Sequence, residues 1–177
     1  MSTRNLLIPA VSLAFVLASR AAFAEGPNLG KPVDPADIAP WDISVGPSGA
    51  GLPAGSGTPA QGAAIFAEKC VACHDLNGKS RFSGPLWGGG PITDISASMK
   101  TIANFWPYAT TLFDFIRRAM PWQQPRSLSD AEVYALTAFI LSKNNLIGET
   151  DTMNAETLSK VRMPNRDNFI IRFPDRI

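Results

Sequence analysis

The feature that most constrains this chain is a run of five residues, CVACH, from Cys70 to His74. It holds both cysteines and the single histidine of the 177 residues. Two thiols separated by two residues can form thioethers with the two vinyl groups along one edge of a haem, and the next residue then brings an imidazole under the iron. The run therefore predicts one covalent haem c, attached through Cys70 and Cys73, with His74 as an iron ligand.

Other uses of two close cysteines fit this sequence less well. A zinc site needs four ligands, and the chain has no further cysteine or histidine to supply them. A redox pair of the thioredoxin type is expected in a βαβ setting, which the surrounding pattern does not offer. A disulfide across two residues closes a very small loop and would stabilise little. The redox dithiol and the disulfide remain as the alternatives to haem.

Because there is no second histidine, the other face of the iron needs a different ligand. Beyond the initiator, the methionines are Met99, Met120, Met153 and Met163. Met120 and Met163 each precede a proline, which favours extended backbone and can project a thioether from a loop. Met120 also lies between two predicted helices, so we predict it as the sixth ligand, with Met163 as the alternative. Met99 and Met153 are expected to fill the core or lie on the surface.

The N-terminus has the pattern of an export signal. Arg4 precedes a mainly apolar run, Leu6 to Leu17, and Ala22-Phe23-Ala24 forms a cleavage pattern of small residues. The run is shorter than the roughly 20 residues of a membrane-spanning helix. We therefore expect residues 1–24 to be a cleaved signal peptide, the mature chain to be periplasmic and no span to remain, with an uncleaved anchor as the alternative.

Composition divides the rest of the chain into three parts. Residues 25–60 contain seven prolines and seven glycines, so we expect residues 25–57 to form an extended arm without regular helix. Residues 58–145 are expected to form the domain and residues 146–177 an irregular tail that wraps it. The net charge of +1 argues against nucleic acid as a partner.

Three helices are predicted in the domain. One begins at Pro59, with Thr58 and Gln61 as a capping box, and runs into the cysteine motif. A second is predicted at 111–118, capped by Thr110 or Thr111. The third begins after Ser129, which forms a capping box with Glu132, and ends near Lys143.

The segment GAAIFAEKCVACH, with Gly62, Phe66 and Cys70 at intervals of four, resembles class I c-type cytochromes. The resemblance implies an all-α fold of three to four helices around one covalent haem. It also implies that Gly62 lets the first helix cross the last closely, with Phe139 as the aromatic partner. By similarity to the family's Gly-Pro loop, the carbonyl of Pro85 would accept the N–H of the His74 imidazole.

A closer resemblance covers most of the mature chain. WDISVGPSGAGLPAGSGT, FWPYATTLFDFIRRAMPW and KVRMPNRDNF are similar to the cytochrome subunit of Sox-type sulfur dehydrogenases. It implies Met120 as the sixth ligand, a molybdopterin-containing subunit as electron donor, and a downstream cytochrome or oxidase as acceptor. This chain has one haem motif where longer members have two, so a free-standing carrier remains an alternative.

Histidine and methionine ligation leaves the iron no open site, so the predicted role is outer-sphere electron transfer. The alternative is a haem enzyme, a peroxidase or a thiosulfate-oxidising cytochrome, which needs a displaceable sixth ligand. Trp106 and Tyr108 are candidate hydrogen-bond donors to a haem propionate. Basic side chains that could steer an acidic partner at the haem edge, or simply be solvated, are Lys79, Arg81, Arg117 and Arg118.

Overall fold

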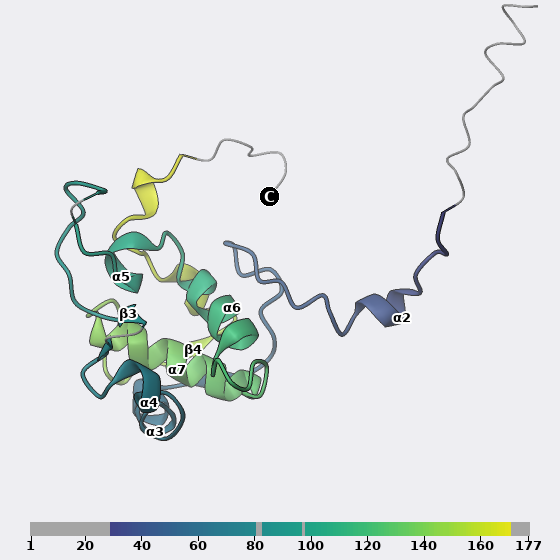
Figure 1. Cartoon of the computed structure of the whole chain (residues 1–177), viewed down its shortest axis with the longest axis horizontal. Coiled ribbons are helices and arrows are strands. Elements are labelled where there is room, and N and C mark those ends of the chain that lie inside the picture. The colour runs from purple at the N-terminus through teal and green to yellow at the C-terminus, as the bar shows by residue number, and fades with distance from the viewer. Residues whose placement is uncertain (1–28, 81–82, 97, 171–177) are drawn as a thin grey trace, which may run out of the picture. The chain divides into compact units, whose positions relative to one another are not determined.

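A computed structural model describes residues 29–80, 83–96 and 98–170, and the chain divides into one unit that ends at Asp42 and another that begins at Ile43 (Figure 1). The predicted signal peptide lies outside the described residues. The first unit contains α2 (Pro35–Ile38), whose N-cap Asp34 accepts a hydrogen bond from the backbone of Ala36. The prediction of no regular helix in the arm is wrong for this turn, because aspartate followed by proline is a strong helix start.

The second unit is built around α7 (Asp130–Lys143), which contacts both α3 (Pro59–Lys69) and α6 (Ala109–Ala119). Figure 1 shows α7 running through the middle of this unit. A Cβ atom at Gly62 would lie 2.0 Å from the carbonyl oxygen of Ala135, so only glycine permits this crossing of α3 and α7. The rings of Phe66 and Phe139 pack at the crossing, with centroids 5.2 Å apart. The predicted role of Gly62 is confirmed.

The helix starts agree with the sequence in two cases and differ in two. The capping boxes of α3 and α7 are both formed. α6 begins at Ala109, directly after Tyr108, and neither Thr110 nor Thr111 caps it with a side chain. The single-turn helix α5 (Ile102–Phe105) was not predicted.

Short strand pairs join segments that flank the helices. β1 (Ser56–Gly57) pairs antiparallel with β4 (Met153–Asn154), and β2 (Lys79–Ser80) pairs antiparallel with β3 (Gly84–Pro85). The remaining elements are the turn α4 (Val71–His74) and the 3-10 helices η1 (Leu158–Lys160) and η2 (Arg166–Asn168). The unit is therefore mainly helical, with two-residue strands as an addition to the expected all-α fold.

The C-terminal segment contributes to the hydrophobic core. Met153, Leu158 and Met163 are all buried in the same cluster as the helices. None of the helices in the part of the chain that the structure describes is long and apolar enough to cross a membrane.

Candidate haem site

A cavity of about 610 Å³ opens between the cysteine turn, the loop around Pro85 and helix α6. Cys70, Cys73, His74 and Met120 all line it. Its other walls are mainly apolar, contributed among others by Ile102, Phe105, Leu112, Ile116, Leu136 and Ile140. This volume falls in the range of about 300–1,000 Å³ usual for cofactor sites.

The end of α3 and the turn α4 place the attachment residues on one face. Cys70 caps the C-terminus of α3, and its carbonyl accepts hydrogen bonds from the backbone N–H groups of Cys73 and His74, at 3.1 and 2.9 Å. Residues three and four apart on a helical turn point the same way. Cys70 and Cys73 form no disulfide, and burial raises the pKa of the Cys70 thiol to about 11. The sequence motif thus folds into a turn that presents two thiols and an imidazole to the cavity.

The His74 ring is half-buried and is held by a side chain that the sequence analysis missed. Ser83 Oγ lies 2.8 Å from His74 Nδ1 and 3.4 Å from the carbonyl oxygen of Cys73. The carbonyl of Pro85, expected from the resemblance, is not the group that the structure places on this nitrogen. Burial lowers the pKa of His74, which favours the neutral imidazole that ligates metals.

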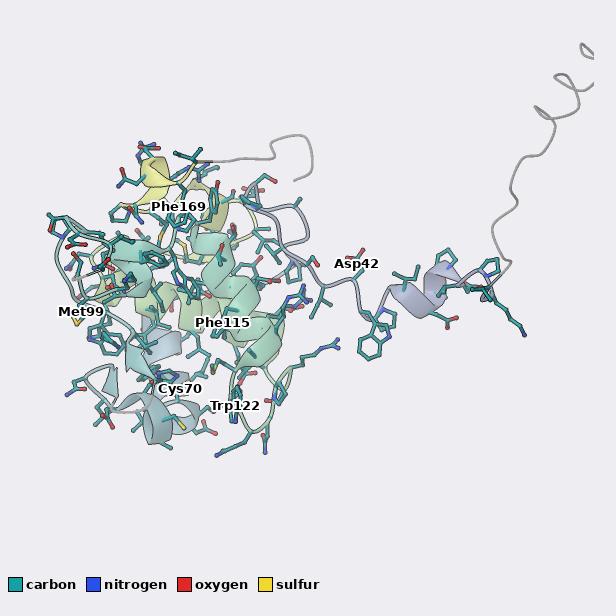
Figure 2. All side chains as sticks on the ribbon, turned by 45° about the horizontal axis from the view of Figure 1, so that its top comes forward. Asp42, Cys70, Met99, Phe115, Trp122 and Phe169 are labelled. Carbon is teal, nitrogen blue, oxygen red and sulfur yellow. The ribbon has the colours of Figure 1, made fainter. Side chains whose placement is uncertain are left out.

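Met120 lines the cavity from the end of α6, a different element from the turn that carries the cysteines. It caps the C-terminus of α6 in extended conformation, with its N–H bonded to the carbonyl of Ile116. Of the other candidates, Met163 and Met153 are only 1% and 4% exposed and belong to the core, while Met99 is 54% exposed on the surface (Figure 2). Neither these two core methionines nor Met99 lines the cavity, so Met120 is the thioether that this fold places there.

Of the two aromatic residues predicted near the haem, one lines the cavity and the other does not. Trp106 lines the cavity and packs edge-on against Phe115. The Tyr108 ring is covered by the guanidinium of Arg166, whose Cζ lies 4.7 Å from the centre of that ring. Only Trp106 of the predicted pair therefore faces the site. Trp122, in the loop after α6, also lines the cavity and is 78% exposed (Figure 2).

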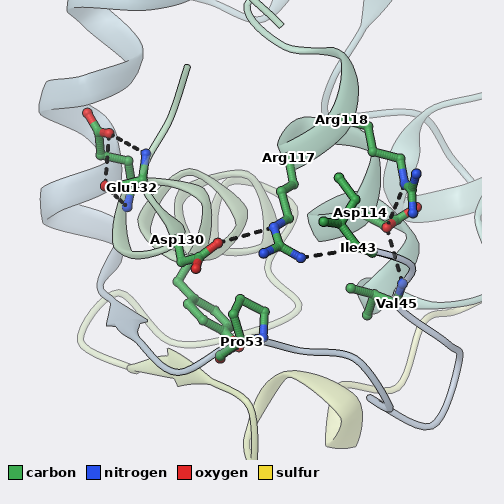
Figure 3. Close-up of polar contacts among 10 residues, drawn as sticks. Ile43, Val45, Pro53, Asp114, Arg117, Arg118, Asp130 and Glu132 are labelled. Carbon is green, nitrogen blue, oxygen red and sulfur yellow. Dashed lines mark hydrogen bonds and ion pairs between the residues drawn. The ribbon is translucent and has the colours of Figure 1, made fainter. Parts of the chain in front are cut away.

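The arginines at the end of α6 hold the residues that lead into β1. Arg117 pairs with Asp130 at 3.1 Å and donates to the carbonyl of Ile43 at 3.4 Å (Figure 3). Arg118 pairs with Asp114, which also accepts from the backbone of Val45. Both side chains are thus engaged in structural contacts and do not line the cavity. The side chains of Lys79 and Arg81 lie outside the described part of the chain.

The donor set and the walls fit a haem c. Two thiols and an imidazole stand on one element, a thioether stands on another, and apolar side chains enclose the space between them. These are the groups that attach and ligate haem in proteins of this chemistry.

Comparison with known proteins agrees with this chemistry. Residues 59–144 match the model of the cytochrome c family. Over 96 residues the chain is 32% identical to a thiosulfate dehydrogenase of Stutzerimonas stutzeri (strain A1501), a match that covers 51% of the chain and 29% of that protein. The chain therefore spans less than a third of the length of that relative.

A solved structure is similar over most of the chain. It is the crystal structure of the sulfane dehydrogenase SoxCD from Paracoccus pantotrophus, with 35% identity and a TM-score of 0.75. The match covers 85% of this chain and 75% of the other.

Proposed function

Because this chain belongs to the cytochrome c family, we propose that it binds one haem c covalently and transfers single electrons. The observation that carries the proposal is the convergence of Cys70, Cys73, His74 and Met120 on one mainly apolar cavity. Bound there, the haem iron supplies reversible one-electron chemistry.

Each of these residues has a definite task in the proposal. Cys70 and Cys73 would hold the haem through thioethers, and His74 would ligate iron through Nε2, since its Nδ1 is engaged by Ser83. Met120 would ligate through sulfur from the end of α6. A thioether favours the reduced iron more than a second imidazole does, and the apolar walls act the same way because the oxidised centre carries more positive charge. We therefore expect a higher potential than that of a bis-histidine cytochrome.

The proposed setting is the periplasm. Residues 1–24 have the pattern of an export signal, and covalent haem attachment takes place outside the cytoplasm. The test is the N-terminus of the exported protein, which we expect at Glu25. A mature chain that still begins at Met1 would contradict cleavage.

The proposed electron donor is a molybdenum-containing sulfite or sulfur dehydrogenase, of which this chain is the cytochrome subunit or the acceptor. The support is the similarity to a chain of the sulfane dehydrogenase SoxCD at 35% identity. Purification of the exported chain from its native periplasm should bring a molybdenum protein with it, detected as molybdenum in the eluate. A chain that elutes alone, yet is reduced by a periplasmic extract, would indicate a free-standing carrier.

A thiosulfate-oxidising enzyme is the second candidate, because of the partial match to a thiosulfate dehydrogenase. Such an enzyme needs a sixth ligand that substrate can displace, whereas a permanent methionine ligand suits a carrier. The two are separated by adding cyanide to the oxidised protein and recording its absorption spectrum. We expect cyanide to bind to the oxidised protein slowly or not at all. Rapid conversion of the spectrum by cyanide would favour the enzyme.

The ligand assignment is tested by a pair of matched substitutions. Met120→Leu should abolish the weak long-wavelength absorption band of a methionine–Fe(III) bond and lower the midpoint potential. Met163→Leu, at a core position of similar chemistry, should keep both. If Met163→Leu loses the band and Met120→Leu keeps it, the assignment of Met120 is wrong.

A further inference from the structure

The strap, residues 43–53, is tied to the end of α6 through a shared carboxylate (Figure 3). Asp114 Oδ1 accepts from the backbone N–H of Val45 at 3.2 Å and from Arg118 Nε at 2.9 Å. The guanidinium of Arg118 also donates to Ser44 Oγ at 3.0 Å. Two neighbouring strap residues are therefore bonded to two α6 residues that lie one turn apart on the same face of the helix.

Arg117 adds a third tie, which also reaches α7. Its guanidinium donates to the carbonyl of Ile43 at 3.4 Å and pairs with Asp130, the first residue of α7, at 3.1 Å. At its other end the strap is bonded to α7, because the hydroxyl of Tyr134 donates to the carbonyl of Pro53 at 2.9 Å. The strap is thus fixed to both helices, and the end of α6 is fixed to the strap and to the start of α7.

Another face of α6 lines the haem cavity. Leu112, Ile116 and Met120 follow at intervals of four and all line it, whereas none of the three α6 residues bonded to the strap does. Met120 comes directly after the last residue of α6, and its N–H is bonded to the carbonyl of Ile116 at 3.1 Å. Because helices fray at their ends, the position of the Met120 sulfur depends on how firmly the last turns of α6 are held.

We propose that the strap positions Met120, and that it keeps the sixth position of the iron closed by holding the last turns of α6. The inference rests on the proposed function, since it presupposes that Met120 ligates haem iron. A ligand from solution can bind only where Met120 has left the iron, so its apparent affinity reports the population of that open state. An intact strap keeps this population small, as a carrier requires.

Two substitutions loosen the contact from its two sides. Asp114→Ala removes, on α6, the acceptor of the Val45 N–H. Gly51→Ala acts on the strap alone, because Gly51 has a φ of +86° and a Cβ atom there would lie 2.0 Å from the carbonyl oxygen of Ser44. In the oxidised, haem-loaded protein, both variants should bind imidazole severalfold more tightly than the wild type. Binding is followed by titration, as loss of the methionine–Fe(III) absorption band.

Each substitution has a matched control. Gly46→Ala, in the same strap, adds a methyl group whose nearest neighbours lie at 3.8 Å. Asp167→Ala removes a carboxylate from an exposed ion pair with Arg162, in the C-terminal segment. Both controls should bind imidazole as weakly as the wild type.

Tyr134→Phe separates the positioning of Met120 from overall stability. It removes the hydrogen bond at the other end of the strap, so it should lower the free energy of unfolding while the affinity for imidazole stays at the wild-type value. An equal rise in affinity in Tyr134→Phe and Gly51→Ala would overturn the proposal, because global stability would then explain both.

Two further results would also overturn the role of the strap. One is wild-type affinity for imidazole in both Gly51→Ala and Asp114→Ala. The other is a rise in Asp114→Ala alone, which would assign the effect to α6 and not to the strap. Failure of the proposed function is distinct from these results, because the wild-type protein would then lack haem or the methionine–Fe(III) band.

Discussion

At the scale of single residues, Gly62 is a position where the fold leaves no room for a side chain. A methyl group there would lie 2.0 Å from the Ala135 carbonyl oxygen and 2.7 Å from Phe139 Cβ, and neither backbone can move without separating α3 from α7. Gly62→Ala should therefore lower the free energy of unfolding by about 1–3 kcal/mol or more, despite the better helix propensity of alanine. Denaturant unfolding measures this.

Gly46→Ala is the matched control for that substitution. A Cβ atom at Gly46 would meet its nearest neighbours, in Ala50, at 3.8 Å, an ordinary contact. It should leave the free energy of unfolding almost unchanged. Equal losses in the two variants would contradict the close crossing at Gly62.

Single residues also show which parts of the site could be predicted from the sequence and which could not. Cys70, Cys73 and His74 are recognisable because their chemistry depends on adjacency, which the sequence displays directly. Ser83 is not, because it meets His74 only after the loop has folded back onto the cysteine turn. Trp87 was missed for the same reason: its contacts with Phe66 and Phe139, 5.7 and 5.9 Å between ring centres, depend on the path of a glycine-rich loop.

At the scale of elements, α3 and α7 are also joined by a surface ion pair. Lys69 Nζ lies 2.6 Å from Glu132 Oε1, and this hydrogen bond, together with those from Ser129, lowers the pKa of Glu132. The same bond raises the pKa of Lys69. Because the pKa of Glu132 is lowered on folding, its contribution to stability is present above its unfolded pKa and is lost as the pH falls through the folded one.

Glu132→Gln isolates that charge, because glutamine also completes a capping box with Ser129. At neutral pH, the free energy of unfolding of the wild type should be slightly higher than that of the variant, as expected for an exposed ion pair. The difference should vanish in acid, below the lowered pKa of Glu132. Urea unfolding at several pH values measures it, and a difference that persists undiminished in acid would contradict the electrostatic origin.

Elements were predictable where their start signals were strong. The capping boxes at Thr58 and Ser129 predicted where α3 and α7 begin, because each precedes a helical segment long enough to bury one of its faces in the core. The single turns α2 and α5 were missed, since a helix of four residues shows no periodicity. α6 begins before the threonines expected to cap it, because tertiary packing decides its first turn: Thr110 is buried, and its hydroxyl has no hydrogen-bond partner among the described residues.

At the scale of the whole chain, the structure places the start of the second unit at Ile43, ahead of the expected domain start at Thr58. Residues between these points are bonded to the helices: the hydroxyl of Tyr134 donates to the carbonyl of Pro53 at 2.9 Å, and Val45 is bonded to Asp114. The proline and glycine content of this segment does not reveal these contacts, because it shows no periodicity. Its apolar residues Trp41, Ile43 and Leu52 are the signal that predicts an arm lying on the domain or on a partner, and Leu52 packs against the core.

Two truncations test that boundary. A haem-loaded chain that begins at Ile43 should unfold at the same temperature as the mature protein, because every described residue before Ile43 is exposed. A chain that begins at Thr58 loses the contacts to α6 and α7 and the β1–β4 pair, so it should unfold several degrees lower. Differential scanning calorimetry compares them, and equal transitions for the two truncations would place the boundary at Thr58 instead.

The central claim is that a haem is covalently attached at Cys70 and Cys73, and the intact mass of the exported, purified chain tests it most directly. The account predicts the mass of the polypeptide without residues 1–24 plus that of one haem, and the polypeptide mass alone for a variant with both cysteines changed to alanine. A colourless wild-type protein with the mass of the bare polypeptide would contradict it.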